Sequence, residues 1–193
     1  MSRIGKKTII VPEKIKAKIE GKTVAVEGPL GKLSYVLPEG IVAELKDNKI
    51  SISVSGEIGA RDALYGTARA RINNMITGVA NGFTKVLEIN GVGFKGSADA
   101  QKLTMQLGFS HPVIIDIPAG IKMSFDPKQT LLTIMGADKC VVGNLAAQIK
   151  RIRPPEPYNG TGIRYQGERI IRKAGKTAAG VGAPGAGGAI GAK

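Results

Sequence analysis

The chain has 193 residues, 42% of them hydrophobic, which is enough apolar material for one large packed domain or two small ones. Lys and Arg number 28 against 15 Asp and Glu, so the net charge is +13 and the surface favours polyanions such as RNA, DNA or an anionic membrane. No apolar run approaches the ~18 residues that a membrane-spanning helix needs, and a single cysteine excludes an internal disulfide framework. These features predict a cytoplasmic protein that binds nucleic acid.

Residues 1–8 form a basic arm carrying Arg3, Lys6 and Lys7, and we expect this arm to be a secondary RNA contact. A first module follows over residues 9–82. Alternating apolar residues between turn signals predict its strands at 23–27, 33–37, 41–45 and 50–54. Apolar residues at spacings of three and four then predict a helix, whose apolar face contains Leu64, Ala68, Ile72, Met75, Ile76 and Val79, with Gly78 and Gly82 as candidate stop signals.

A second module over residues 83–152 repeats this plan. Its strands are predicted at 84–90, 103–107, 113–117, 121–125 and 131–135. A helix over residues 138–151 should bury Val142, Leu145 and Ile149. Asp138 is its candidate N-cap, and the Pro154-Pro155 pair prevents the helix from continuing.

The two modules are copies of each other. A constant shift of 80 residues aligns Gly28 with Gly108, and the same shift pairs Pro38 with Pro118, Gly40 with Gly120, Ile72 with Ile152 and Arg71 with Arg151. Strands in blocks followed by a helix predict an α+β fold, with two tandem copies of a mainly antiparallel module and one helix in each. A basic extension over residues 153–176 and a flexible Ala/Gly-rich tail over residues 177–193 complete the chain.

No grouping of residues predicts an enzyme, a metal site or a cofactor. His111 and Cys140 stand alone, without the partners that metal or acid–base sites require. The motif Gly91-Val92-Gly93-Phe94-Lys95-Gly96 matches the dinucleotide fingerprint, but a strand follows it where that fingerprint opens a helix. We therefore interpret it as a glycine-rich hairpin or bulge, whose Lys95 can contact a phosphate.

The strongest functional signal is the run from Lys150 to Lys176. Its glycines permit close backbone approach, its prolines stiffen the entry, and arginine binds phosphate in a bidentate manner. The chain has few aromatic residues, which favours contact with phosphates and with the shape of folded RNA over base stacking. The predicted RNA-binding residues are Lys150, Arg151, Arg153, Tyr158, Asn159, Gly160, Thr161, Gly162, Arg164, Tyr165, Arg169, Arg172, Lys173 and Lys176.

Three stretches resemble the bacterial large-subunit ribosomal protein six family. They are Met1-Ser2-Arg3-Ile4-Gly5-Lys6-Lys7, Val26-Glu27-Gly28-Pro29-Leu30-Gly31 and, most specifically, Arg151-Ile152-Arg153-Pro154-Pro155-Glu156-Pro157-Tyr158-Asn159-Gly160-Thr161-Gly162-Ile163-Arg164-Tyr165. The resemblance implies a structural constituent of the large subunit. It would bind 23S-type rRNA near the base of the lateral stalk, beside other large-subunit proteins and close to where translational GTPases dock.

The chain departs from that family where Asn159 and Thr161 replace two usual lysines, which predicts a smaller counterion-release contribution there. Two alternatives remain open. A free-standing RNA-binding assembly or regulatory factor would not sediment with the large subunit after a moderate salt wash. A small enzyme using the Gly91–Gly96 loop would bind nucleotide, and a change at Gly93 would abolish that binding.

Overall fold

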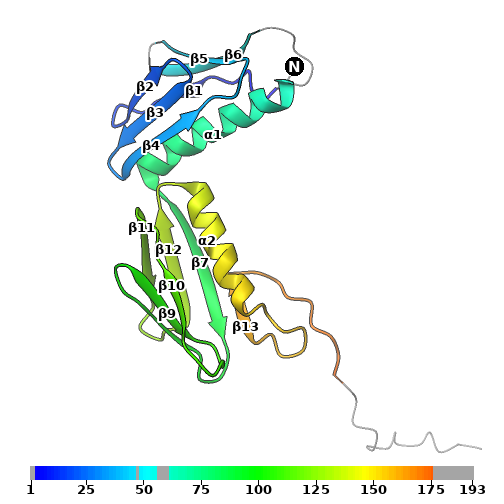
Figure 1. Ribbon diagram of the computed structural model, residues 1–193. Coiled ribbons are helices and arrows are strands. Elements are labelled where there is room, and N and C mark those ends of the chain that lie inside the picture. Colours follow the sequence, from blue (N-terminus) through cyan, green and yellow to red (C-terminus); the bar gives the residue numbers. More distant parts are fainter. Residues whose placement is uncertain (1–2, 47, 56–60, 176–193) are drawn as a thin grey trace, which may run out of the picture.

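The computed structural model describes residues 3–46, 48–55 and 61–175, so the predicted Ala/Gly tail and Lys176 lie outside the described residues. The chain forms two α+β modules stacked end to end, each with one helix packed against antiparallel strands (Figure 1). This confirms the predicted tandem α+β architecture. In the described part of the chain, no helix is long and apolar enough to cross a membrane.

The first module contains two three-stranded antiparallel sheets, ordered β2-β3-β4 and β1-β6-β5. One long helix, α1 (Arg61–Asn81), packs against strands of both sheets. The strands are β1 (Ile9–Ile10), β2 (Lys16–Glu20), β3 (Thr23–Gly28), β4 (Gly31–Val36), β5 (Ile41–Lys46) and β6 (Lys49–Val54). The four predicted strands are confirmed within two residues at each end, whereas β1 and β2 were not predicted.

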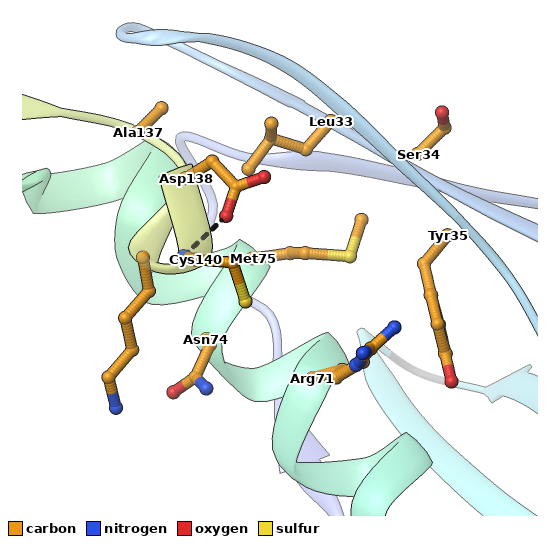
Figure 2. A pocket seen from close by; sticks show the side chains of 10 residues that line it. Leu33, Ser34, Tyr35, Arg71, Asn74, Met75, Ala137, Asp138 and Cys140 are labelled. Carbon is orange, nitrogen blue, oxygen red and sulfur yellow. Dashed lines mark hydrogen bonds between the residues drawn. The ribbon is translucent and has the colours of Figure 1, made fainter. Parts of the chain in front are cut away.

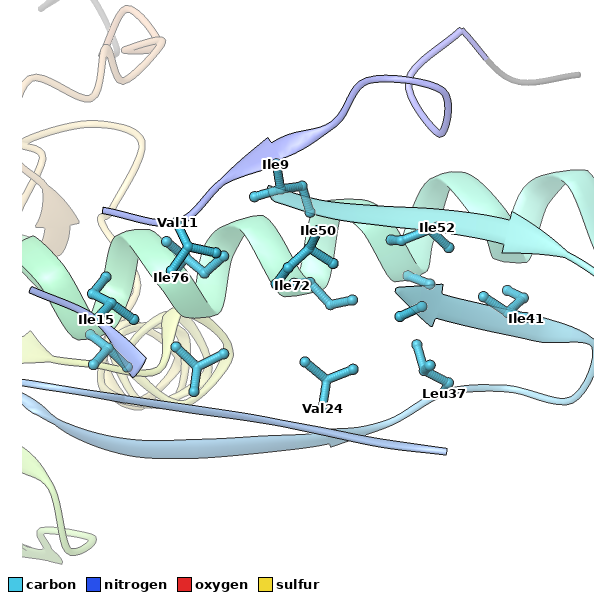
Figure 3. Close-up of a cluster of buried hydrophobic side chains, with 14 of the residues drawn as sticks. Ile9, Val11, Ile15, Val24, Leu37, Ile41, Ile50, Ile52, Ile72 and Ile76 are labelled. Atoms are coloured by element: carbon cyan, nitrogen blue, oxygen red, sulfur yellow. The ribbon is translucent and has the colours of Figure 1, made fainter. Parts of the chain in front are cut away.

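The core of the first module lies between α1 and the strands (Figure 3). Alternate residues of β6, such as Ile50 and Ile52, point into it, as period-two patterning requires. The predicted position of Leu64 on the apolar helix face is wrong, because Leu64 is 43% exposed and Tyr65 is buried in its place. Gly78 does not stop the helix. It is buried within α1, which ends just before Gly82, a left-handed residue with φ +77°.

The second module repeats the six strands followed by a helix and adds one strand after that helix. Its strands are β7 (Phe83–Asn90), β8 (Lys95–Ala98), β9 (Lys102–Gln106), β10 (Val113–Asp116), β11 (Ile121–Phe125), β12 (Leu131–Gly136) and β13 (Gly162–Tyr165). They form the sheets β10-β9-β8 and β11-β12-β7-β13. Helix α2 (Lys139–Ile152) follows Asp138, whose carboxylate accepts a hydrogen bond from the Cys140 amide at 2.7 Å, so the predicted N-cap is confirmed.

Strand β13 comes from the basic extension and was not predicted. It pairs antiparallel with β7, with Gly162 opposite Asn90 and Tyr165 opposite Leu87. Ile163 on this strand is completely buried in the second core. The extension therefore contributes a strand to the sheet of the second module, and its cations are held on a fixed backbone.

The modules meet over a short junction. Gly82 alone separates the end of α1 from the start of β7. Gly78 packs so closely against the second module that a Cβ there would overlap the carbonyl oxygen of Ala137. Within the second module, the ammonium of Lys139 lies over the ring of Phe83, the first residue of β7. The one-residue linker and the packing of Gly78 on Ala137 fix one module against the other.

Candidate nucleic-acid interface

The candidate interface lies at the end of the second module that faces away from the first module (Figure 1). There the basic extension meets the loop between β7 and β8. The two segments surround a polar hollow of about 330 Å³, called here the terminal hollow, which is lined by Asn90, Gly91, Val92, Asn159, Gly160, Thr161, Arg164 and Arg172. Five of these eight residues were predicted from the sequence as RNA contacts.

A tight backbone turn shapes one wall of the terminal hollow. The amide of Gly160 donates to the carbonyl of Glu156 at 3.0 Å, and the amide of Glu156 donates to the carbonyl of Thr161 at 2.9 Å. Gly160 adopts φ +76° and Gly162 adopts φ +138°, which glycine tolerates best. Gly162 also lies against the backbone of Pro154, where a Cβ would be 2.5 Å from its carbonyl oxygen.

The end of the extension returns over this turn. The amide of Lys173 donates to the carbonyl of Pro157 at 2.8 Å. This places the Arg172 guanidinium against Gly160, with Nη2 3.2 Å from the position that a Cβ would occupy. A long-range backbone contact thus brings Arg172 to the rim of the hollow, twelve positions along the chain from Gly160.

Arg164 is paired with a carboxylate of the protein itself. It stands directly opposite Glu88 across the β13–β7 pair, and its Nε lies 2.6 Å from Glu88 Oε2. Both side chains are more than two-thirds buried. Such a partly desolvated cross-strand pair stabilises the position of β13, and it neutralises a charge that the sequence alone would count toward RNA.

Arg153 is also engaged within the protein. Its guanidinium lies over two aromatic rings, 5.1 Å from the centroid of Phe94 and 5.3 Å from that of Phe109. Its Nη1 donates to the carbonyl of Leu107 at 2.7 Å. Arginine stacks on aromatic faces in this manner. Arg153 therefore ties the extension to the β7–β8 and β9–β10 loops.

Lys150 forms a third internal contact. Its ammonium lies 2.5 Å from Glu168 and 4.8 Å from the ring centroid of Tyr165. The second oxygen of Glu168 accepts a hydrogen bond from the Tyr165 amide at 3.0 Å. The hydrogen bond from Lys150, followed by that from the Tyr165 amide, holds the pKa of Glu168 below its usual value of 4.5. This cluster fixes the turn that follows β13.

The remaining predicted cations of the Lys150–Lys176 run are exposed. They are Arg151 of α2 and Arg169, Arg172 and Lys173 of the extension, called here the four exposed cations. Within the described residues, none of the four has an ion-pair partner. Tyr158 is 51% exposed beside them, and Val92 is completely exposed at the rim of the hollow. These side chains are available to a ligand without breaking a contact within the protein.

The predicted secondary contacts lie elsewhere. Lys95 is exposed at the start of β8, next to the glycine-rich loop. Arg3, Lys6 and Lys7 are exposed near the start of α1, where Gly5 packs on Tyr65. Gly5 contacts Tyr65, which lies 16 residues, or about 24 Å along the helix, before the end of α1 at Asn81, so the arm lies away from the junction. The structure does not bring the arm to the terminal hollow.

Sequence reasoning missed Asn90, Gly91 and Val92 as parts of this site, and it also missed the roles of Glu88, Phe94 and Phe109. The glycine-rich motif did single out their loop, but only for Lys95. The missing information was the pairing of β13 with β7, which joins residues more than seventy positions apart. His111 is exposed and stacks near Phe109, and no cluster of three or more potential metal ligands occurs among the described residues.

Comparisons with known proteins agree with this architecture. A family model described as "Ribosomal protein L6" matches residues 11–82 and 90–166, one segment in each module. The large ribosomal subunit protein uL6 of Synechococcus sp. (strain RCC307) is 48% identical over 177 residues, covering 92% of this chain and 98% of that protein. The uL6 protein of Methylacidiphilum infernorum (isolate V4) is 49% identical over 178 residues, covering 92% and 99% respectively.

A third relative, uL6c of Pyropia yezoensis, is 47% identical over 180 residues, covering 93% of this chain and 99% of that protein. The similarity thus extends over both modules and most of the extension. It confirms the resemblance that the motifs suggested, and it shows a structural protein and not an enzyme. The chain belongs to the ribosomal protein L6 family.

Proposed function

We propose that this chain is a structural constituent of the large ribosomal subunit and that the end of its second module binds 23S-type rRNA. The observation that carries the RNA proposal is the terminal hollow, where the exposed Arg172 meets the donors of Asn159 and Thr161 on a turn held by backbone hydrogen bonds. The relatives named as large-subunit proteins support the assignment to that subunit.

Phosphate contact is the expected mode of binding. Arg172 at the rim, its chain neighbour Lys173 and the exposed Arg151 of α2 would neutralise phosphates and release their counterions. Asn159 and Thr161 line the hollow and carry donors for phosphate or sugar oxygens. The glycines at the turn let an RNA backbone approach closely. This arrangement recognises the shape of folded RNA, and it organises rRNA structure by holding adjacent strands in place.

The internally paired cations have a different function in this proposal. Lys150, Arg153 and Arg164 hold the extension on β7 and on the adjacent loops. They present the exposed cations on a preformed surface, which lowers the ordering cost of binding. The predicted RNA site therefore separates into side chains that position the surface and side chains that meet the ligand.

A charge-matched comparison tests the proposal. The triple variant Arg151→Ala, Arg172→Ala and Lys173→Ala removes three exposed cations without breaking an ion pair. The control changes Lys102, Lys122 and Lys128 to Ala, which removes three exposed cations from other strands and loops of the same module. We expect only the first variant to lose affinity for rRNA, by at least about tenfold, and to reduce the salt slope by about two units.

Equal losses of rRNA affinity in the two triple variants would contradict a specific binding surface. They would show that the protein binds RNA only through its overall positive charge. Sedimentation then separates the ribosomal role from that of a free-standing factor. The unaltered chain should remain with the large subunit after a moderate salt wash, whereas an assembly or regulatory factor would be released.

The proposed position in the subunit is near the base of the lateral stalk, close to the docking region of translational GTPases. Its support is the resemblance of the Arg151–Tyr165 run to the family's RNA-binding segment. A cleavage reagent tethered to a cysteine introduced at Tyr158, in a chain carrying Cys140→Ser, should cut rRNA at the stalk base. Cuts confined to another region of the subunit would contradict this position.

A further inference from the structure

A second groove lies far from the terminal hollow, between β4 and α1. Figure 2 shows Leu33, Ser34 and Tyr35 on one side of it, Arg71, Asn74 and Met75 of α1 on the other, and the start of α2 at its end. Its volume is about 220 Å³. We propose that this groove binds an extended acidic segment of a neighbouring protein, which adds to the sheet as a strand beside β4. The inference rests on the proposed role in a protein-rich assembly.

The first support is the free edge of β4. The sheet order is β2-β3-β4, so β4 pairs with β3 on one side. Among the described residues, no strand pairs with β4 on its other side. An edge strand leaves backbone donors and acceptors available, and strand addition is a common way to recognise an extended peptide. The edge is six residues long, which suits a short segment.

The second support is an apolar floor. The side chains of Leu33, Tyr35 and Met75 are partly buried and line the groove. Side chains of a strand alternate between its two faces, so every second residue of an incoming strand would point at this floor and should be apolar. A base can stack on an aromatic ring, but a polynucleotide has no backbone amides and carbonyls to pair with the free edge of β4. The floor and the edge together therefore favour a peptide over RNA.

The third support is the charge at the rim. Arg71 is exposed, with its guanidinium 5.2 Å from the ring centroid of Tyr35, and Lys139 lines the α2 end, with its ammonium 5.7 Å from the ring centroid of Phe83. Asp138 also lines the groove, but its carboxylate already accepts the amide of Cys140. Arg71 and Lys139 have no carboxylate partner within the described chain, so two positive charges against the one carboxylate of Asp138 leave the groove with a net charge of +1. Acidic side chains on the other face of the incoming strand would complement it.

Residues of both modules line the groove, which lies beside the strands of the first module. Gly78 and Ala137 hold the start of α2 against α1, so the end wall is rigid. The repeat does not reproduce the groove. The shift of 80 residues turns Met75 into Pro155, which lies beyond the end of α2 at Ile152. The second module therefore lacks the helix turn that supplies the floor.

The test uses purified large subunits that contain the full chain. A photo-crosslinking benzoylphenylalanine replaces Ser34, which is exposed in the groove, and a control places it at Glu39, which is exposed outside the groove. Sedimentation first verifies incorporation, so that failure of the ribosomal role is seen separately. We expect the Ser34 position alone to crosslink to one protein peptide, which mass spectrometry should identify as an acidic extended segment.

A charge-reversal variant, Arg71→Glu with Lys139→Glu, should reduce that crosslink at least about fivefold while rRNA binding at the extension is unchanged. A milder variant, Arg71→Gln with Lys139→Gln, removes the charges without reversing them and is less liable to disturb folding. It should show a smaller reduction of the crosslink. Three results would each overturn the proposal. They are a crosslink to rRNA alone, no crosslink from protein that is incorporated into the subunit, and a crosslinking yield that neither variant changes.

Discussion

Arg164 of β13 lies directly opposite Glu88 of β7, with its Nε 2.6 Å from Glu88 Oε2. The pair joins the basic extension to the body of the second module. It also makes Arg164 a residue that holds β13 on the second module, where the sequence predicted a free RNA contact. The same distinction governs the other cations of the extension, and it leads to predictions that separate stability from binding.

Arg164→Gln should destabilise the protein by about 1–2 kcal/mol, because it removes a charged hydrogen bond and leaves Glu88 partly buried without its partner. Urea unfolding followed by circular dichroism measures this change. The double variant Arg164→Gln with Glu88→Gln should recover part of the loss, since the double-mutant cycle removes both charges. Additive losses in the cycle would show that the two side chains do not interact.

Arg153→Lys should loosen the loops around the terminal hollow, because lysine lacks the planar group that stacks between Phe94 and Phe109. We expect faster amide hydrogen exchange at residues 108–111 and weaker rRNA binding, although the charge is retained. Arg71→Lys, the same change at an exposed arginine of the first module that lies over the ring of Tyr35, is the control and should alter neither quantity. Unchanged exchange in Arg153→Lys would exclude the positioning role.

Gly162→Ala should disrupt the turn that forms the terminal hollow. Its φ of +138° is unfavourable for alanine, and the added Cβ would press on the Pro154 carbonyl. Gly167→Ala is the matched control, because Gly167 also has a positive φ but faces open space. The control should lose about 1 kcal/mol. Thermal melts and rRNA binding should both show a larger loss for Gly162→Ala, and equal losses would contradict the packing argument.

Asn159→Lys with Thr161→Lys should strengthen rRNA binding and steepen its salt dependence. Both side chains line the terminal hollow, so the two added charges would meet phosphates there. The expected increase in the salt slope is about 1.4–1.8 units if both make contact. Binding titrations over a range of salt concentrations measure it. An unchanged slope would show that RNA does not enter the hollow.

Acidification should release the turn after β13. Lys150 and the Tyr165 amide lower the pKa of Glu168 in the folded state, so this group contributes stability above its unfolded pKa. That contribution is lost as the pH falls through the lowered folded pKa. A carboxyl NMR titration of Glu168 should give a midpoint below 4.5. In Lys150→Met the midpoint should rise, and an unshifted midpoint would contradict the assigned cause.

Local sequence patterns predict much of the fold. Asp138 caps α2 because a short carboxylate before an apolar helix can accept an amide of the first turn, which depends on neighbouring residues alone. Strands with regular alternation, such as β6, were predicted for the same reason. Leu64 was misassigned because helical spacing allows either Leu64 or Tyr65 to face the core. The packing of Gly5 on the ring of Tyr65 favours the second arrangement.

The sequence by itself determined the duplicated α+β plan, the basic character of Lys150–Lys176 and the resemblance to a ribosomal family. Each of these depends on order and composition along the chain. Only the tertiary structure decided which cations of that run face outward. Pairing of β13 with β7 brings Arg164 to Glu88, and loop packing brings Arg153 to Phe94. Such contacts join residues that are far apart in the sequence. Whether a charged side chain is neutralised depends on its neighbours in space, and the order of residues along the chain does not reveal those neighbours.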